Sequence, residues 1–110
     1  MDVFTDGSGT GKYIYFIPEK KLKKISQKQR ITHNEAEYYG VIQALTDIKD
    51  KDICIYSDSK LIVNQLNKKY KLKEPRMKRL AEQVWKLREG RDIKFKWIPR
   101  EKNFAGKILG

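Results

Sequence analysis

Short β-prone runs open the chain, and longer stretches with helical spacing follow them. Residues 3–5 and 13–17 are dominated by β-branched and aromatic side chains, which favours two strands. The glycine-rich residues 7–11 between them predict a turn, and Pro18 ends or bends the second strand. Residues 20–26 carry two large apolar side chains among lysines, so we expect an exposed third strand at a sheet edge.

The middle of the chain changes period. From Asn34 to about residue 48, apolar positions recur with helical spacing, which predicts the first helix. Residues 52–57 form a fourth strand, and both of its faces are largely apolar, as expected for a strand covered on both sides. Asp58 or Ser59 is suited to cap a second helix that runs to Leu66.

The last third of the chain predicts a helix, a strand and a short helical end. Pro75 suits the first turn of a third helix, and Gly90 closes it. The apolar stripe of this helix consists of Met77, Leu80, Ala81, Val84 and Leu87. Residues 93–97 alternate apolar side chains with lysines, as a half-buried strand does, and residues 102–110 allow only a short final helix. This order of elements predicts an α/β domain in which helices cover a mixed sheet.

The charge balance indicates a polyanionic partner. Lysine and arginine number 25 against 14 aspartates and glutamates, a net charge of +11 in 110 residues, a length that suits one domain. Basic side chains bind nucleic acids by displacing counterions from phosphates. A soluble surface rich in lysine and glutamate is the alternative, but here the positive charges outnumber the negative ones. No apolar run approaches the ~18 residues of a membrane span, and no obligate protein partner is evident.

Several single residues and short motifs have ordinary structural explanations. Cys54 is the only cysteine, and its apolar neighbours predict a buried small hydrophobe. Trp85 and Trp97 lie on apolar stripes and are expected in the core. The GSGTGK segment departs from the P-loop pattern on both sides and predicts a hairpin turn. The first residues, MDVFTDG, lack the basic and apolar regions of a secretory signal, so a cytoplasmic protein is expected.

Three acidic residues stand where predicted strands end or a helix begins. Asp6 ends the first strand, Asp58 ends the fourth, and Glu37 lies in the first turn of the first helix. If the two strands are neighbours, the aspartates emerge side by side beneath Glu37. Such a cluster suits Mg²⁺, and two ions about 4 Å apart can activate water and stabilise a leaving oxygen. Singly, each acid also fits a hairpin, a helix cap or a favourable first-turn charge.

The motifs around these acids resemble those of ribonuclease HI. TDGS follows the first strand, T-x-N-x-x-E opens the first helix and SDSKLIVNQLN follows the fourth strand; YKLKEPRMKRL and WIPREKN are similar as well. The resemblance runs from about residue 2 to residue 103. It implies a ribonuclease H-like fold, with a five-stranded mixed sheet in the order 3-2-1-4-5 and a C-terminal helix that is short or absent. It also implies hydrolysis of the RNA strand of RNA–DNA hybrids with two Mg²⁺ or Mn²⁺ ions.

The resemblance also assigns roles to residues. Asp6, Glu37 and Asp58 match three of the family's four catalytic, metal-binding carboxylates, whereas Glu35 is expected to be only a helix-start acid. Substrate-contacting positions are matched by Gly7, Ser8, Arg30, Thr32, His33, Asn34 and Lys60. A basic patch would hold phosphates of the DNA strand, unless it is an ordinary solvated face; it comprises Lys68, Lys69, Lys71 and Lys73.

The match breaks at the fourth carboxylate. The family pattern places an aspartate four residues after Asn103, where Lys107 stands, or Gly106 if the loop is shifted by one. A lysine there would repel a cation instead of binding it. Three accounts are open: cleavage with three acids, a weakened or inactive module that binds RNA-containing duplexes, or a C-terminal end altered relative to a longer protein. Double-stranded RNA is a second possible substrate. A more distant hypothesis is a basic structural protein that binds folded RNA.

Overall fold

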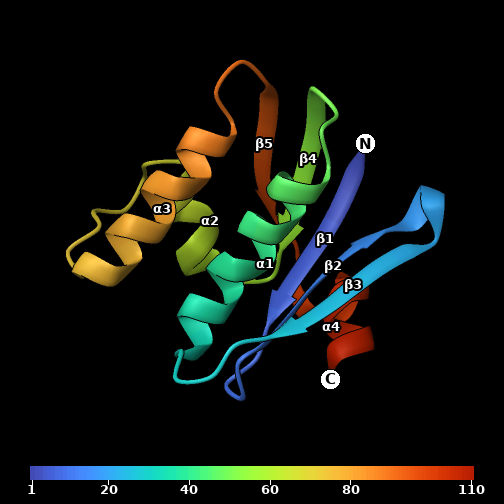
Figure 1. Cartoon of the computed structure of the whole chain (residues 1–110), viewed down its shortest axis with the longest axis horizontal. Coiled ribbons are helices and arrows are strands. Elements are labelled where there is room, and N and C mark those ends of the chain that lie inside the picture. Colours follow the sequence, from blue (N-terminus) through green and yellow to red (C-terminus); the bar gives the residue numbers. More distant parts are fainter.

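The computed structural model describes all 110 residues and contains a five-stranded sheet flanked by helices (Figure 1). The strands are β1 (Asp2–Gly7), β2 (Lys12–Ile17), β3 (Leu22–Gln27), β4 (Asp52–Ser57) and β5 (Asp92–Trp97). The helices are α1 (His33–Asp47), α2 (Lys60–Leu66), α3 (Pro75–Leu87) and α4 (Phe104–Leu109). The strand order is β3-β2-β1-β4-β5; β1, β2 and β3 run antiparallel, and β4 is parallel to β1 and to β5. The predicted mixed sheet and the short final helix are confirmed.

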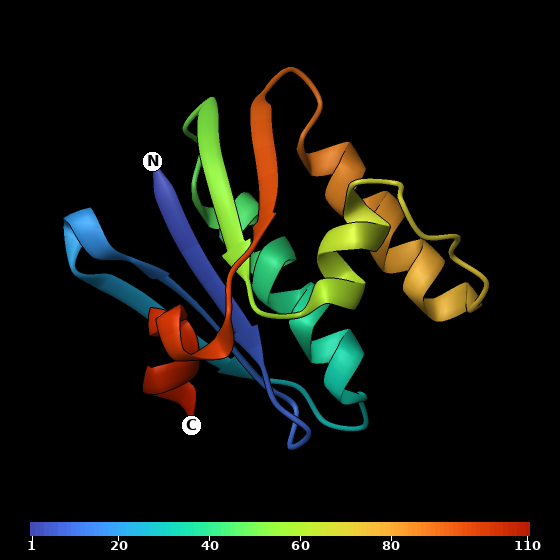
Figure 2. The ribbon, with the colours of Figure 1, turned by 180° about the vertical axis from the view of Figure 1, so that it is seen from behind.

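The helices form two unequal layers. α1 and α2 pack on one face of the sheet with α3 against them, and α4 lies alone on the opposite face (Figure 2). Alternate strand residues such as Val3, Ile55 and Ile93 are buried beneath the larger layer. None of the helices combines the length and the apolarity needed to cross a lipid bilayer.

The second face of β4 is only partly covered, contrary to the prediction. Ile53 and Ile55 are buried, whereas Cys54 and Tyr56 on the opposite face are half-buried. The cause is the length of α4, because its six residues cover β1 and β2 but do not extend over β4. Tyr56 is instead stacked on Phe4, with ring centroids 5.0 Å apart. The prediction of a buried Cys54 was wrong for the same reason.

α1 begins with a capping box, which fixes the end of the helix that carries Glu37. The Thr32 hydroxyl accepts a hydrogen bond from the Glu35 N–H (3.1 Å), and the Glu35 carboxylate accepts one from the Thr32 N–H (2.9 Å). These reciprocal bonds satisfy N–H groups that the start of a helix leaves free. The helix-start role predicted for Glu35 is confirmed.

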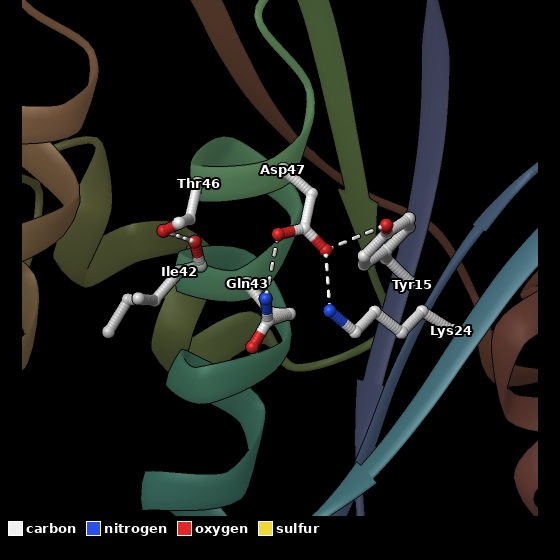
Figure 3. Close-up of polar contacts among 6 residues, drawn as sticks. All are labelled: Tyr15, Lys24, Ile42, Gln43, Thr46 and Asp47. Atoms are coloured by element: carbon white, nitrogen blue, oxygen red, sulfur yellow. Dashed lines mark hydrogen bonds and ion pairs between the residues drawn. The ribbon is translucent and has the colours of Figure 1, made fainter.

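The other end of α1 is tied to the antiparallel strands through Asp47 (Figure 3). One carboxylate oxygen accepts hydrogen bonds from the Tyr15 hydroxyl (2.9 Å) and the Lys24 ammonium (3.1 Å). The other oxygen accepts from the Gln43 amide (2.9 Å). Burial alone would raise the pKa of Asp47, but these donors outweigh burial and lower that pKa. The contacts offset the unfavourable charge of an acid at a helix C-terminus and hold β3 to the helix.

Arg91, in the turn before β5, joins the ends of two helices. Its guanidinium donates hydrogen bonds to four carbonyls, which belong to Leu45, Ile48, Asp50 and Leu87. Three of these carbonyls lie at or just beyond the end of α1, and the fourth ends α3. Carbonyls at helix C-termini lack partners within the helix, so a planar cation with five donors is well suited to them.

Candidate active site

Three carboxylates converge at one edge of the sheet. Asp6 lies near the end of β1, Asp58 directly follows β4, and Glu37 lies near the start of α1. β1 and β4 are parallel neighbours, so their ends bring the two aspartates to one place beside the helix. One ligand oxygen from each residue lies within 4.8 Å of the others. Asp6 and Glu37 are each only 4% exposed, whereas Asp58 is half-buried and gives the cluster an open side.

Gly7 permits the close contact between β1 and α1 that this convergence requires. A Cβ atom at Gly7 would lie 2.3 Å from the backbone nitrogen of Glu37 and 2.4 Å from the carbonyl carbon of Ala36. The Gly7 N–H also donates a hydrogen bond to the Glu37 carboxylate. The resemblance assigns Gly7 to an approach of RNA to the backbone; the structure shows in addition that the helix could not pack here beside any larger residue.

The three carboxylates disfavour one another's charge. Burial, and then the charges of Asp6 and Asp58, raise the pKa of Glu37 to about 9. Burial also raises the pKa of Asp6, and the charge of Asp58 adds to that rise. With no cation bound, burial and the two neighbouring carboxylates thus favour the protonated form of Glu37.

The donor set fits a hard divalent cation. All three candidate ligands are carboxylates, which Mg²⁺ and Mn²⁺ prefer to nitrogen or sulfur ligands. A bound dication would offset the repulsion that keeps a proton on Glu37. The open side at Asp58 leaves room for water and for oxygens of a substrate. The residues present are thus suited to a metal centre.

Asn103 connects the last loop to the carboxylates. It is fully buried, and its side-chain amide donates hydrogen bonds to the Thr5 carbonyl and to the Asp58 carboxylate, both at 3.0 Å. Its side-chain oxygen accepts from the Ala105 N–H at 3.1 Å and so caps α4. One residue therefore orients Asp58 and anchors α4 to β1.

Gly106 occupies the position on α4 that faces the carboxylates of Asp6 and Asp58. A Cβ atom at Gly106 would lie 3.5 Å from Asp58 Oδ2 and 3.6 Å from Asp6 Oδ2. Lys107 is exposed, and its ammonium lies 5.7 Å from the centre of the Phe104 ring. The sequence allowed Lys107 or Gly106 as the position of the fourth ligand. The geometry favours Gly106, because it faces the carboxylates and Lys107 is exposed.

A pocket of about 170 Å³ adjoins the carboxylates. Its lining consists of Asp6, Gly7, Ser8, Gly9, His33, Arg100, Leu109 and Gly110. Burial raises the pKa of Asp6, and the positive charge of Arg100 offsets part of that rise. Arg100 and Ser8 thus place a guanidinium and a hydroxyl at this pocket, and both groups can bind a phosphate.

The other predicted contacts lie outside this pocket. Arg30, Thr32 and Asn34 are exposed around the start of α1, and Arg30 has a left-handed φ of 62°. Lys60 is exposed at the start of α2, with its ammonium over the ring of Trp97. The basic patch is exposed on the loop between α2 and α3, at Lys68, Lys69, Lys71 and Lys73.

Sequence reasoning missed the roles of Arg100 and Asn103 and misplaced Trp97. Trp97 is 42% exposed and not in the core, because it ends β5 beyond the cover of α2 and α3. Trp85 is partly buried against the core. The polar run REKN after the last strand is the signal that could have directed attention to Arg100 and Asn103, since loops after strand ends often carry site residues.

Comparison with known sequences agrees with this geometry. The sequence model of the RNase H family matches residues 1–106. The bifunctional protein Rv2228c of Mycobacterium tuberculosis is 36% identical over 78 residues, which cover 67% of this chain and 21% of that protein. An uncharacterized protein of Mycobacterium bovis, Mb2253c, matches to the same extent. The chain therefore spans about a fifth of the length of the curated relatives it matches.

Solved structures share the fold. The N-terminal RNase H domain of Rv2228c, fused to maltose-binding protein, has a TM-score of 0.83 at 27% identity, covering 96% of this chain and 88% of that chain. LC11-RNase H1 in complex with an RNA/DNA hybrid has a TM-score of 0.80 at 26% identity, covering 99% of each chain. RNase H1 of Halobacterium salinarum has a TM-score of 0.84 at 24% identity, covering 98% and 92%, a likeness of fold alone. The match to the family model over residues 1–106 and the shared fold together establish that this chain belongs to the RNase H family.

Proposed function

We propose that the protein is a metal-dependent endonuclease that hydrolyses the RNA strand of RNA–DNA hybrids. The observation that carries this proposal is the convergence of Asp6, Glu37 and Asp58 within 4.8 Å of one another, in a chain of the RNase H family. The net charge of +11 supports a nucleic-acid substrate. A relative of the same fold has been crystallised with an RNA/DNA hybrid, which supports this duplex as the substrate class.

The carboxylates would hold Mg²⁺ or Mn²⁺, with two ions per site. Such ions supply an activated water and neutralise the oxygen that leaves the phosphorus. Asp6 and Asp58 would provide ligand oxygens from neighbouring strand ends, and Glu37 would provide one from the helix in its ionised form. Asn103 holds the Asp58 carboxylate in place through its amide.

The surface around the cluster would bind the duplex. Ser8, His33 and Arg100 line the pocket beside Asp6, where the RNA strand would be bound. On this proposal Arg30 and Thr32 hold a phosphate of the DNA strand, while Asn34 and Lys60 approach the minor groove, the readable side of an A-like duplex. The basic patch adds contacts to phosphates farther along.

Cleavage of a hybrid with a labelled RNA strand tests this proposal. We expect the wild-type protein to cut it with Mg²⁺ or Mn²⁺, and EDTA to abolish cutting. Asp58→Asn should lower the rate by about 100-fold or more, because it weakens a proposed metal ligand. Asp50→Asn, a change at an exposed acid outside the cluster, is the matched control and should retain the rate. Double-stranded RNA and double-stranded DNA substrates measure the duplex preference.

A second candidate function is a weakened or inactive module that binds RNA-containing duplexes. Gly106 favours it, because the α4 position that faces Asp6 and Asp58 carries no carboxylate. This alternative predicts that the wild-type protein and Asp58→Asn bind hybrid equally, with affinity that falls as salt rises, and that neither cuts it. That result would refute the nuclease proposal.

A further inference from the structure

Trp97 occupies an unusual position for a large aromatic residue. It is the last residue of β5, pairs with Ser57 at the end of β4 and is 42% exposed. Ser57 is the residue before Asp58, so the strand register places the indole beside the candidate metal ligand. Because so exposed a tryptophan contributes little to the core, its role is to be sought in its contacts at the surface.

The indole N–H and the ring face of Trp97 both contact the segment that starts α2. The indole N–H donates a hydrogen bond of 3.0 Å to the Asp58 carbonyl. The Lys60 ammonium lies 4.6 Å from the centre of the ring, within the range of a cation–π contact. Between them, Ser59 caps α2 through the Ile62 N–H. One side chain thus restrains two neighbours of the same short turn.

We propose that Trp97 is a positioning residue of the candidate active site: it fixes the main chain of Asp58 and holds the ammonium of Lys60 toward the duplex. This inference rests on the proposed function of the site. An exposed lysine samples many rotamers, and a contact with an aromatic face reduces the entropy that it loses on binding a ligand. A hydrogen bond to the carbonyl of a ligand residue reduces the freedom of its carboxylate in the same way.

The chain contains a control of nearly identical construction. The Trp85 indole N–H donates a 3.0 Å hydrogen bond to the Leu66 carbonyl at the other end of α2, and the Lys68 ammonium lies 4.8 Å from its ring centre. Trp85 has the same two contacts but is not attached to a carboxylate of the cluster. Any effect on metal binding that is specific to Trp97 therefore reflects its place beside Asp58.

The first test is an NMR titration of wild-type protein labelled with ¹⁵N. The two tryptophans give two indole N–H signals, which Trp85→Phe assigns. On titration with Mg²⁺ alone, the Trp97 signal should shift along a saturable curve and the Trp85 signal should not. Asp58→Asn should raise the Mg²⁺ concentration needed for half of the Trp97 shift by at least about tenfold. A Trp97 signal that does not respond to saturating Mg²⁺ would overturn the inference.

The second test separates the two contacts of Trp97. Trp97→Phe keeps a ring for Lys60 but removes the N–H, so it should lower the apparent Mg²⁺ affinity about tenfold. Trp85→Phe should leave that affinity unchanged. Lys60→Met should raise KM for the hybrid about three- to tenfold without changing the Mg²⁺ affinity. Equal effects of the two Phe variants on Mg²⁺ affinity would contradict a positioning role.

Failure of the proposed function can be told apart from failure of this inference. A wild-type protein that cuts no hybrid, but whose Trp97 signal follows Mg²⁺, would refute the nuclease activity and retain the positioning role. If Trp97→Phe fails to fold, as circular dichroism would show, Trp97→Tyr replaces it, and the wild-type titration needs no variant at all.

Discussion

At the scale of single residues, Gly106 is a position where one side chain would change the chemistry of the site. The Cβ position faces Asp6 and Asp58 at 3.6 Å and 3.5 Å. We expect Gly106→Asp to supply a fourth carboxylate and to raise Mg²⁺ affinity on the order of tenfold, because affinity grows with the number of charged ligands. Isothermal titration calorimetry with Mg²⁺ measures this effect.

Two further variants control this prediction. Gly106→Ala adds the Cβ atom without the charge and should not raise the Mg²⁺ affinity. Lys107→Asp tests the alignment without a shift; it should act more weakly, since Lys107 is exposed on α4. A larger gain from Lys107→Asp than from Gly106→Asp would show that the fourth ligand position is residue 107.

At the scale of elements, Arg91 predicts a large loss of stability on substitution. Arg91→Ala leaves carbonyls of Leu45, Ile48 and Leu87 without their donor. The free energy of unfolding should fall by roughly 2–4 kcal/mol, because hydrogen bonds from a charged donor are among the stronger ones. Urea unfolding followed by circular dichroism measures the change. Arg79→Ala, on the exposed side of α3, should change it by less than about 0.5 kcal/mol; equal losses would contradict the prediction.

The elements also show what a sequence pattern can and cannot predict. The fold could be predicted from the order of the strand and helix patterns and from the family motifs. The patterns are local to each element, and the motifs cover nearly the whole chain. The carboxylate cluster followed because its members stand at strand ends and a helix start. Trp97 and Cys54 were misplaced because alternation within a strand does not reveal how far the covering helices extend.

The missed contacts depend on pairs that are far apart in the sequence. Arg91 meets carbonyls up to 46 positions away, and Asn103 meets Thr5 across 98 positions. A lone polar residue in a loop has no period, so nothing local reports its partner. Only the folded chain brings these groups together.

At the scale of the whole molecule, the cluster makes stability depend on pH and on metal. The pKa of Glu37 is raised from its ordinary 4.5 to about 9 in the folded protein. The folded state therefore holds this proton more tightly than the unfolded state. The resulting stabilisation is complete below about pH 4.5 and is lost as pH rises toward 9. In EDTA, Tm should fall across this window, and Glu37→Gln should flatten the slope.

Mg²⁺ should act in the opposite direction. Its binding competes with the proton on Glu37, so the rise in Tm that Mg²⁺ causes should be larger at about pH 8.5 than at about pH 6. Differential scanning fluorimetry at both values, with Glu82→Gln as a control at an exposed acid, measures this difference. An equal rise at both values would show that Glu37 does not bind the ion.

The bond from Asn103 to Thr5 has a consequence for synthesis on the ribosome. The two residues are 98 positions apart, so at ~5–20 residues per second they emerge about 5–20 s apart. During that interval the nascent chain can form β1 with its hairpin partners, but Asp58 lacks its amide partner and α4 has no anchor. The site therefore acquires the support of Asn103 last, after the strands and helices between the two residues have emerged.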